Sequence, residues 1–353
     1  MALRVIDAGR VSPLRSQALW HGIASAMTDG DDPVLSLCIP SDPYVGIGYH
    51  RRLEELDLRH TGRRRIRVIR RRIGGGPVWL DSDQLFFQLT APAGKVSPVV
   101  SRLYEDCLGP AVDAFRSLGL DARLHAVNDI VVGDRKISGT GAGRIADAVT
   151  VVGNVILRFP YEQMVEVLAL PCEEMRAEVA RLMRRHVASL SDLGRPDVDH
   201  AQAAQALVET YTSWFGPSVH GALRPEEERE VLRWEDRMSS PQWLRGPGLP
   251  ERPARTVKVR AGLHVAWAQH DGVELLTTIT DGVITRARVR ARDDARSPTD
   301  TDRAVLLAAA PELEKALVGA GATAASARER LGAHGDPGRR VGEALSAALG
   351  WRD

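Results

Sequence analysis

One lysine stands out as a residue whose type and position suit chemistry. The chain has 47 basic residues, of which only four are lysine, so arginine supplies positive charge almost everywhere. Lys136 lies between two strand-like runs and precedes Ser138 and Gly139 in a glycine-rich stretch. A fixed ammonium stabilises the negative charge that builds on carboxylate and phosphate oxygens when ATP activates an acid to an acyl-adenylate, and Asp129 is suited to hold it. The alternative at this point is a surface hairpin with a solvated lysine.

A glycine-rich turn flanked by arginines is the second candidate. The segment RRRIGGGPVWLD covers residues 70–81, and Gly74, Gly75 and Gly76 follow a strand-like run. Without side chains in the way, backbone N–H groups can approach a ligand closely, and the arginines favour a phosphate or carboxylate there. The pattern is neither a Walker loop nor GxGxxG. By itself, the segment fits a tight turn with solvated arginines equally well.

Together, these segments resemble the lipoate–protein ligase family, within the biotin/lipoate ligase fold, in their order and spacing. The family pattern is an arginine pair, a GGG loop ending in aspartate, an Asn-Asp pair and then Lys-x-Ser-Gly. Those features here are Arg70-Arg71, the three glycines with Asp81, Asn128-Asp129 and Lys136-Ile137-Ser138-Gly139. Residues 46–50 look like the family's early glycine motif, and residues 257–284 are similar to the accessory domain of its longer members. The resemblance spans nearly the whole chain.

The resemblance implies a two-step reaction. Lipoate and ATP give lipoyl-AMP, and the lipoyl group then moves to a lysine of an acceptor, either a lipoyl domain of a 2-oxoacid dehydrogenase acyltransferase subunit or the glycine cleavage H protein. By analogy, Lys136 and Asp129 are the catalytic pair, with Lys136 on the acyl carbonyl and phosphate oxygens. The implied substrate- and nucleotide-binding residues are Arg71, Gly74, Gly75, Gly76, Val78, Trp79, Asp81, Asn128, Ser138 and Gly139, with Val78 and Trp79 near the adenine. Mg²⁺ is expected with ATP, although the sequence contains no metal-ligand cluster.

Several residues depart from the commoner ligase pattern. Ile73 stands where many members have serine or threonine, Pro77 replaces a small residue, and Leu80 replaces a histidine before Asp81. Val152 and Asn154 stand where histidine and threonine are common. These positions belong to the nucleotide and acyl pocket, so the choice between lipoate and octanoate stays open at this point.

Cys172 carries the main alternative. Octanoyltransferases share the fold and the lysine, and they use a cysteine in a similar Pro-Cys context to form an acyl-thioester without ATP. Pro171-Cys172 fits that position, but the sequence that follows lacks the family's usual glycine. A free cysteine is also often simply a packed residue. A third possibility is a binding protein that keeps the fold without catalysis, which the intact Lys136 opposes.

The helices and strands that must position these residues do not follow one another in strict alternation. Apolar periodicity predicts helices at 16–27, 99–118, 161–168, 173–188 and 201–215, and strands at 33–39, 44–49, 66–73, 85–90, 129–132 and 149–157. The glycine-rich residues 133–147 are expected as a connection. Without strict strand–helix alternation, the pattern favours an α+β mixed sheet with flanking helices over a doubly wound fold.

Domain organisation follows from a proline-rich stretch. Residues 239–256 contain four prolines and are expected to be neither helix nor strand. We therefore predict a catalytic domain at 1–245, a linker at 246–256 and a small α+β accessory domain at 257–353, with a hairpin turn at Asp281-Gly282.

Composition limits the remaining possibilities. The 47 basic and 46 acidic residues give a net charge of +1, which argues against a nucleic-acid or membrane-surface partner. Three cysteines without a CxxC pair give neither a disulfide framework nor a zinc site. The start lacks a signal-peptide core, and no apolar run is long enough to cross a membrane. We expect a cytoplasmic protein.

Overall fold

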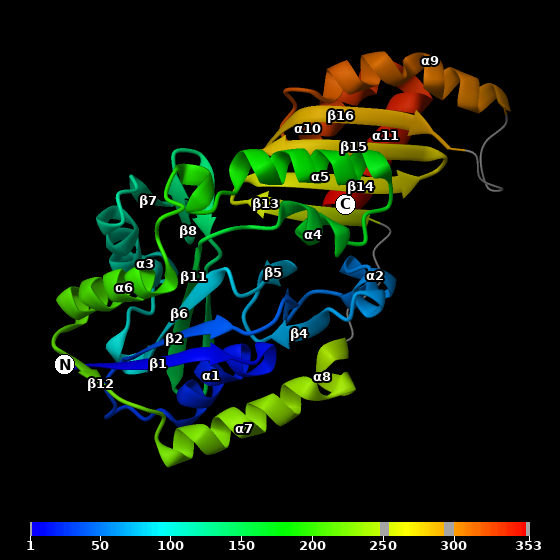
Figure 1. Ribbon diagram of the computed structural model, residues 1–353. Helices are drawn as coiled ribbons and strands as arrows, with labels where there is room; N and C mark the ends of the chain where they lie inside the picture. Colours follow the sequence, from blue (N-terminus) through cyan, green and yellow to red (C-terminus); the bar gives the residue numbers. More distant parts are fainter. Residues whose placement is uncertain (1, 248–253, 293–299, 351–353) are drawn as a thin grey trace. The chain divides into compact units, whose positions relative to one another are not determined.

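The computed structural model describes residues 2–247, 254–292 and 300–350. The chain divides into two compact units (Figure 1). The first contains residues 1–169 and 184–249, and the second contains residues 170–183 and 250–353. The sequence interpretation assigned residues 170–183 to the catalytic domain, whereas here they are counted with the C-terminal unit.

A six-stranded mixed sheet forms the centre of the first unit. β1 runs parallel to β2 and β12, whereas β2, β6, β11 and β10 pair antiparallel. In order across the sheet, the strands are β10 (Gly141–Ile145), β11 (Ala148–Ile156), β6 (Gln84–Pro92), β2 (Val34–Pro40), β1 (Leu3–Val11) and β12 (Ser218–His220). Every residue of β6 is buried, as expected for a central strand covered on both faces.

Two three-stranded sheets carry the two chemical motifs. The first has the order β4 (Arg67–Arg71), β3 (Tyr44–Gly48), β5 (Val78–Leu80), and the glycine loop connects β4 to β5. The second is antiparallel and consists of β7 (Ala122–His125), β8 (Asp129–Val132) and β9 (Arg135–Ser138). Each motif is therefore anchored on its own small sheet.

Helices surround these sheets. Those of the first unit are α1 (Pro13–Ala26), α2 (Leu58–Arg63), α3 (Val100–Ser117), α4 (Tyr161–Glu166), α6 (His200–Phe215), α7 (Pro225–Ser239) and α8 (Pro241–Arg245), with short 3₁₀ turns at Leu53–Glu55, Ala93–Lys95 and Ser191–Leu193. The Ser12 side chain caps α1 by accepting from the Arg15 N–H, and Pro13 occupies its first turn. Proline is favoured there because its missing N–H would be unbonded anyway.

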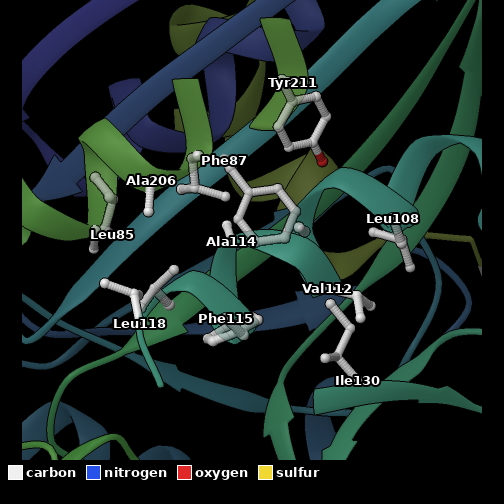
Figure 2. Close-up of a cluster of buried hydrophobic side chains, with 14 of the residues drawn as sticks. Leu85, Phe87, Leu108, Val112, Ala114, Phe115, Leu118, Ile130, Ala206 and Tyr211 are labelled. Carbon is white, nitrogen blue, oxygen red and sulfur yellow. The ribbon is translucent and has the colours of Figure 1, made fainter. Parts of the chain in front are cut away.

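The larger apolar core lies where α3 and α6 pack (Figure 2). Leu85 and Phe87 of β6 belong to it together with Leu108 and Phe115 of α3 and Tyr211 of α6. The Tyr211 hydroxyl donates to the Cys107 carbonyl at 2.8 Å. Satisfying that buried hydroxyl allows a tyrosine to sit in an otherwise apolar cluster.

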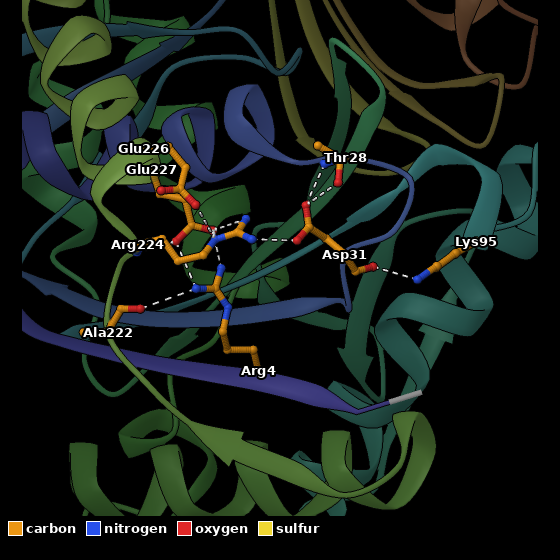
Figure 3. Close-up of polar contacts among 8 residues, drawn as sticks. All are labelled: Arg4, Thr28, Asp31, Lys95, Ala222, Arg224, Glu226 and Glu227. Carbon is orange, nitrogen blue, oxygen red and sulfur yellow. Dashed lines mark hydrogen bonds and ion pairs between the residues drawn. The ribbon is translucent and has the colours of Figure 1, made fainter.

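A network of charged side chains joins the start of α7 to β1 and to the loop after α1 (Figure 3). The buried Glu227 carboxylate, at the start of α7, pairs with Arg4 of β1 and with Arg224. Arg224 also pairs with Asp31 at 2.6 Å, and the Asp31 carbonyl accepts from Lys95. These contacts hold the beginning of α7 beside β1 and the loop after α1.

The second unit is an antiparallel meander with helices on both faces. Its strands are β13 (Ala254–Arg260), β14 (Leu263–His270), β15 (Val273–Thr280) and β16 (Val283–Ala291), and its helices are α9 (Asp300–Leu317), α10 (Ala324–Leu331), α11 (Gly335–Leu349) and most of α5 (Glu173–His186), with a 3₁₀ turn at Gly332–His334. Ala287 and Val289 join the apolar cluster with α9 and α11. On the alternate face, Arg286 pairs with the buried Glu178 of α5 at 2.5 Å.

Some predicted elements need correction. Residues 133–147 contain β9 and β10 rather than only a connection. The stretch 239–256 contains α8 and the start of β13, because Ser240 caps α8 and Pro241 occupies its first turn, where proline does no harm. Helices α7 and α11 and strand β1 were not predicted. Residues 248–253 of the predicted linker lie outside the described residues.

None of the helices within the described ranges is long and apolar enough to span a membrane.

Candidate functional site

Two neighbouring arginines of β4 have different surroundings. Arg70 is fully buried, and its guanidinium donates to five backbone carbonyls, those of Gly48, Tyr49, Arg51, Leu244 and Arg245. These bonds connect the loop after β3 to the end of α8. Because adjacent residues of a strand point to opposite faces, Arg71 is left to face the glycine loop.

Arg71 hydrogen-bonds the glycine loop through one terminal nitrogen of its guanidinium and not through the other. Its Nη2 donates to the carbonyls of Gly74 at 3.0 Å and Gly76 at 2.9 Å. Its Nη1 is buried without a hydrogen-bond partner among the described residues. Burial lowers the pKa of Arg71 to about 10, so the group remains charged at neutral pH. A buried donor without a partner is costly in a protein, and a carboxylate or phosphate ligand would satisfy it.

The glycine loop approaches Gly48, the last residue of β3, too closely for a side chain there. A Cβ on Gly48 would lie 2.2 Å from the Gly75 carbonyl oxygen. Gly75 itself has φ +98°, a conformation that other residues rarely adopt. The loop therefore packs closely against Gly48 and is hydrogen-bonded by Arg71.

Lys136 lies on a strand and meets a buried carboxylate. Its Nζ is 2.7 Å from Oδ1 of Asp129, whose side chain is 1% exposed, compared with 20% for Lys136. The β8–β9 register changes between Ile130 and Val131, which leaves Ile137 as an extra residue opposite that step. Such a bulge redirects side chains at the end of a hairpin. The lysine is thus held in place by an opposite charge while part of it still reaches solvent.

The residues that flank this pair are tied together. The Asn128 side-chain amide donates to the Thr140 carbonyl at 3.3 Å, and the Thr140 hydroxyl donates to the Asn128 carbonyl. The segment before Asp129 and the segment after Ser138 are therefore bonded to each other across the end of the hairpin.

Asn154 of β11 holds the Ser138-Gly139 segment against the large sheet. Its Oδ1 accepts from the Gly139 N–H at 2.7 Å, and its backbone N–H donates to the Ser138 hydroxyl at 3.2 Å. Its Nδ2 donates to Oε1 of Gln84 at 2.7 Å. Asn154 is 7% exposed and Gln84 is fully buried, so these bonds form away from water.

Gln84 continues this chain of hydrogen bonds to the first motif. Its Nε2 donates to the Trp79 carbonyl at 3.1 Å. The Trp79 indole donates to Asp81 at 2.7 Å, and Asp81 also accepts from the Asp83 N–H. Burial raises the pKa of Asp81. Asp81 thus organises the turn between β5 and β6, and the Gln84–Asn154 pair joins that turn to the lysine hairpin.

The residues that depart from the commoner pattern fill this interior. Ile73 is 3% exposed, and its methyl group lies where a Cβ on Gly141 would be only 2.6 Å away. Leu80 is buried in the same apolar cluster, and Val152 packs against it. Ile73 therefore brings the glycine loop against the strand that follows Lys136, so the two motifs are neighbours.

Cys172 belongs to the second unit. Burial raises the pKa of its thiol, and the carboxylates of Glu274 and Glu174 raise it further. A reactive thiolate needs an electropositive environment, and these carboxylates supply the opposite. Cys38 and Cys107 are buried free thiols.

Within residues 2–247, 254–292 and 300–350, no group of three or more His, Cys, Asp or Glu side chains is arranged to hold a metal ion.

Sequence reasoning missed two contributors, Gln84 and Arg70, and named Asn154 only as a departure. A signal for Gln84 was present, since a glutamine within the apolar run QLFFQLTAP implies a buried amide with a partner. Arg70 appeared only as half of the arginine pair, and nothing in the sequence distinguishes its burial from that of Arg71.

Comparison with known proteins gives a consistent family. The model of the lipoyl protein ligase A/B catalytic domain matches residues 12–212. The lipoate-protein ligase A subunit 1 of Thermoplasma acidophilum is 26% identical over 244 residues, which are 65% of this chain and 91% of that protein.

Solved structures show the same fold. The bipartite lipoate protein ligase of Thermoplasma acidophilum, studied with its E2 lipoyl domain, superposes with a TM-score of 0.65 at 24% identity, covering 71% of this chain and 99% of that one. A lipoate-protein ligase A bound with ATP superposes with a TM-score of 0.61 at 24% identity, covering 70% and 99%.

Proposed function

Because this chain belongs to the lipoyl protein ligase A/B family, we propose that it is an ATP-dependent ligase that activates lipoate and attaches it to a lysine of an acceptor protein. The observation that carries the proposal is the Lys136–Asp129 pair, whose hairpin is joined through Asn154 and Gln84 to the strand that follows the glycine loop. The Arg71 guanidinium beside that loop has a buried donor without a hydrogen-bond partner among the described residues. The Lys136 ammonium can stabilise the negative charge that develops when an acid is activated, and the Arg71 guanidinium can bind an anionic ligand.

In the first step, the lipoate carboxylate attacks the α-phosphorus of ATP and pyrophosphate leaves. Negative charge increases on the phosphate oxygens between the two substrates. The Lys136 ammonium stabilises that charge, and Asp129 holds the lysine in position. Arg71 binds an oxygen of the acyl-phosphate through Nη1, and Gly74, Gly75 and Gly76 leave room for it.

The remaining proposed residues shape the site. Asn128, Ser138 and Gly139 lie around the phosphate, and Asn154 and Gln84 hold Ser138 and Gly139 in position. Val78 and Trp79 lie near the adenine. Asp81 acts by fixing the Trp79 indole.

In the second step, a neutral lysine amine of the acceptor attacks the acyl carbonyl. The new C–N bond forms, the C–O bond to AMP breaks, and the amine proton leaves to solvent. Lys136 stabilises the oxyanion that forms on the carbonyl. The rate rises with pH while the acceptor lysine loses its proton.

Magnesium would accompany ATP and would neutralise part of the phosphate charge when bound.

The thioester route is less well supported. A transferase would need the Cys172 thiolate, whose formation is opposed by burial and by Glu274 and Glu174. We further propose a lipoyl domain as acceptor, with the glycine cleavage H protein as a second one, and a reducing cytoplasm as the location, which suits three free thiols.

The test is the intact mass of a lipoyl domain lacking its lipoyl group after incubation with the protein in two mixtures. One contains lipoate, ATP and magnesium, and the other contains octanoyl carrier protein without ATP. A lipoyl mass increase in the first mixture alone is expected. An octanoyl increase in the second alone would identify a transferase. Failure in both, together with failure to form an adenylate, would indicate a non-catalytic binding protein.

A further inference from the structure

Five exposed arginines lie together before the glycine loop. Arg59 and Arg63 belong to α2, Arg64 and Arg65 follow it, and Arg67 begins β4. We call this set the arginine patch. Each has more than a third of its surface exposed, and the ion pairs found among the described residues include none of the five.

Elsewhere in the first unit, many arginines are paired internally. Arg15 pairs with Glu228, Arg116 with Asp113, and Arg224 with three carboxylates. The arginines of the patch differ, because the ion pairs found among the described residues include none of them, in a chain whose total charge is only +1. The positive charge of the patch therefore faces solvent without an ion-pair partner in the part of the chain that the structure describes.

The local backbone makes the patch more unusual. The Ile66 N–H donates to the Thr61 carbonyl, and the Arg65 N–H donates to the Gly62 carbonyl. This pair of bonds is a Schellman ending, in which the residue with positive φ is usually glycine. Here Arg65 occupies it with φ 55°. An arginine in the left-handed region costs on the order of 1 kcal/mol, and Arg59 and Arg63 add a like-charge repulsion one helical turn apart.

Simple structural explanations cover only parts of the patch. A basic residue in the last turn of α2 interacts well with the helix dipole, which accounts for Arg63. Charge on an edge strand discourages aggregation, which accounts for Arg67 because β4 is an edge of its sheet. Neither explains an arginine at the glycine position or the concentration of five charges.

The patch lies close to the proposed acyl site. Arg67 and Arg71 are four residues apart on one strand, or about 13 Å at roughly 3.3 Å per residue. A domain of about 100 residues has a radius of gyration of about 13 Å. A protein of that size whose lysine reaches the acyl group therefore covers surface at this distance.

We infer that the arginine patch is the docking surface for an acidic face of the acceptor protein. This inference rests on the proposed function and identifies the charge of its partner. Opposite charges accelerate encounter and set orientation, so the patch acts on acceptor binding and leaves acyl-adenylate formation alone. Its position beside the acyl site favours the protein that receives the group over a nucleic acid.

The test compares two double variants of the full chain with an apo lipoyl domain as acceptor. Arg63→Glu/Arg64→Glu reverses two charges in the patch. Arg10→Glu/Arg229→Glu makes the same charge change at exposed arginines of β1 and α7. We expect the patch variant to raise the KM for the acceptor at least tenfold and to weaken its dependence on salt. Its rate of lipoyl-adenylate formation without acceptor should equal that of the wild type, and the control should stay within twofold throughout.

Three outcomes overturn the inference. An unchanged acceptor KM in the patch variant, without competition by a short RNA, would show that the arginines serve only the helix end and the strand edge. An equal rise in the control would show a long-range effect of net charge. Absence of adenylate formation in the wild type would contradict the proposed function instead, so the two failures are distinguishable. Competition by a short RNA at the same salt, with no effect of the variant on the acceptor KM, would assign the patch to nucleic acid.

Discussion

Lys136 and Cys172 are two side chains for which the sequence suggested reaction chemistry, and both lie near carboxylates, with opposite consequences for that chemistry. The Lys136 ammonium lies 2.7 Å from the buried carboxylate of Asp129. Burial raises the pKa of the Cys172 thiol, and the carboxylates of Glu274 and Glu174 raise it further. An ammonium beside a carboxylate is ready to stabilise an anion, whereas a thiol among carboxylates resists becoming a nucleophile. The reactivity of a side chain thus depends on its neighbours more than on its type.

The strongest test of this contrast removes the lysine. Lys136→Ala should lower the rate of adenylate formation at least a thousandfold, because the charge that stabilises the transition state is lost. Pyrophosphate release in single-turnover experiments measures it. The double variant Lys136→Ala/Asp129→Asn also removes the buried negative charge that the lysine had balanced, so it should regain thermal stability without regaining activity. A normal adenylate yield from Lys136→Ala would refute the role.

Acid should weaken the fold at a different residue, His21. This fully buried ring hydrogen-bonds the Gln17 carbonyl through Nδ1 and accepts from the Arg72 N–H next to the glycine loop. Burial lowers its pKa from 6.5 to about 3. Between those values, the unfolded chain binds a proton that the folded chain does not, so the free energy of unfolding falls as pH decreases, by up to about 1.4 kcal/mol per pH unit.

Urea unfolding of the wild type and His21→Gln between pH 7 and 5 measures this effect, in a range where most carboxylates remain ionised. The variant should show a flatter dependence. Parallel curves would mean that His21 does not titrate as described.

The variant Gln84→Ala tests whether neighbouring residues determine the chemistry of the site. It removes a buried amide that joins Trp79 to Asn154, so we expect a loss of about 1–3 kcal/mol in stability and a fall of about tenfold in kcat for adenylation. Gln88 is a matched control, since it lies on the same strand and bonds the Ser16 carbonyl and Ser36. Gln88→Ala should lose similar stability and keep kcat. Equal losses of kcat would show a general effect of destabilisation.

The smallest effect is expected at the cysteine. Cys172→Ala should change ligation by less than twofold, measured as lipoyl transfer at saturating substrates, because the thiol has no part in the ligase route. Complete loss of transfer in this variant, with an intact fold by circular dichroism, would overturn the preference for ligase chemistry.

The family and the α+β fold were predictable from the sequence and are confirmed. The two motifs were visible because their chemistry requires local features, such as three adjacent glycines or a lysine near a serine and a glycine. Apolar periodicity located α1, α3 and α6 for a similar reason, since each buries one face. Helix α7 was not predicted because its sequence is rich in charged residues. Strand β10 was not predicted because its glycines are typical of a loop, whereas here they make room for Ile73.

Only the tertiary structure decided how the motifs meet. The Asn154–Gln84 hydrogen bond joins residues 70 positions apart, and Arg70 bonds carbonyls as far away as Arg245. The sequence determined which residues could carry charge, accept hydrogen bonds or leave space for a ligand, because those properties belong to each side chain. Burial and partners arise from long-range packing, and they separate Arg70 from Arg71 and Lys136 from Cys172.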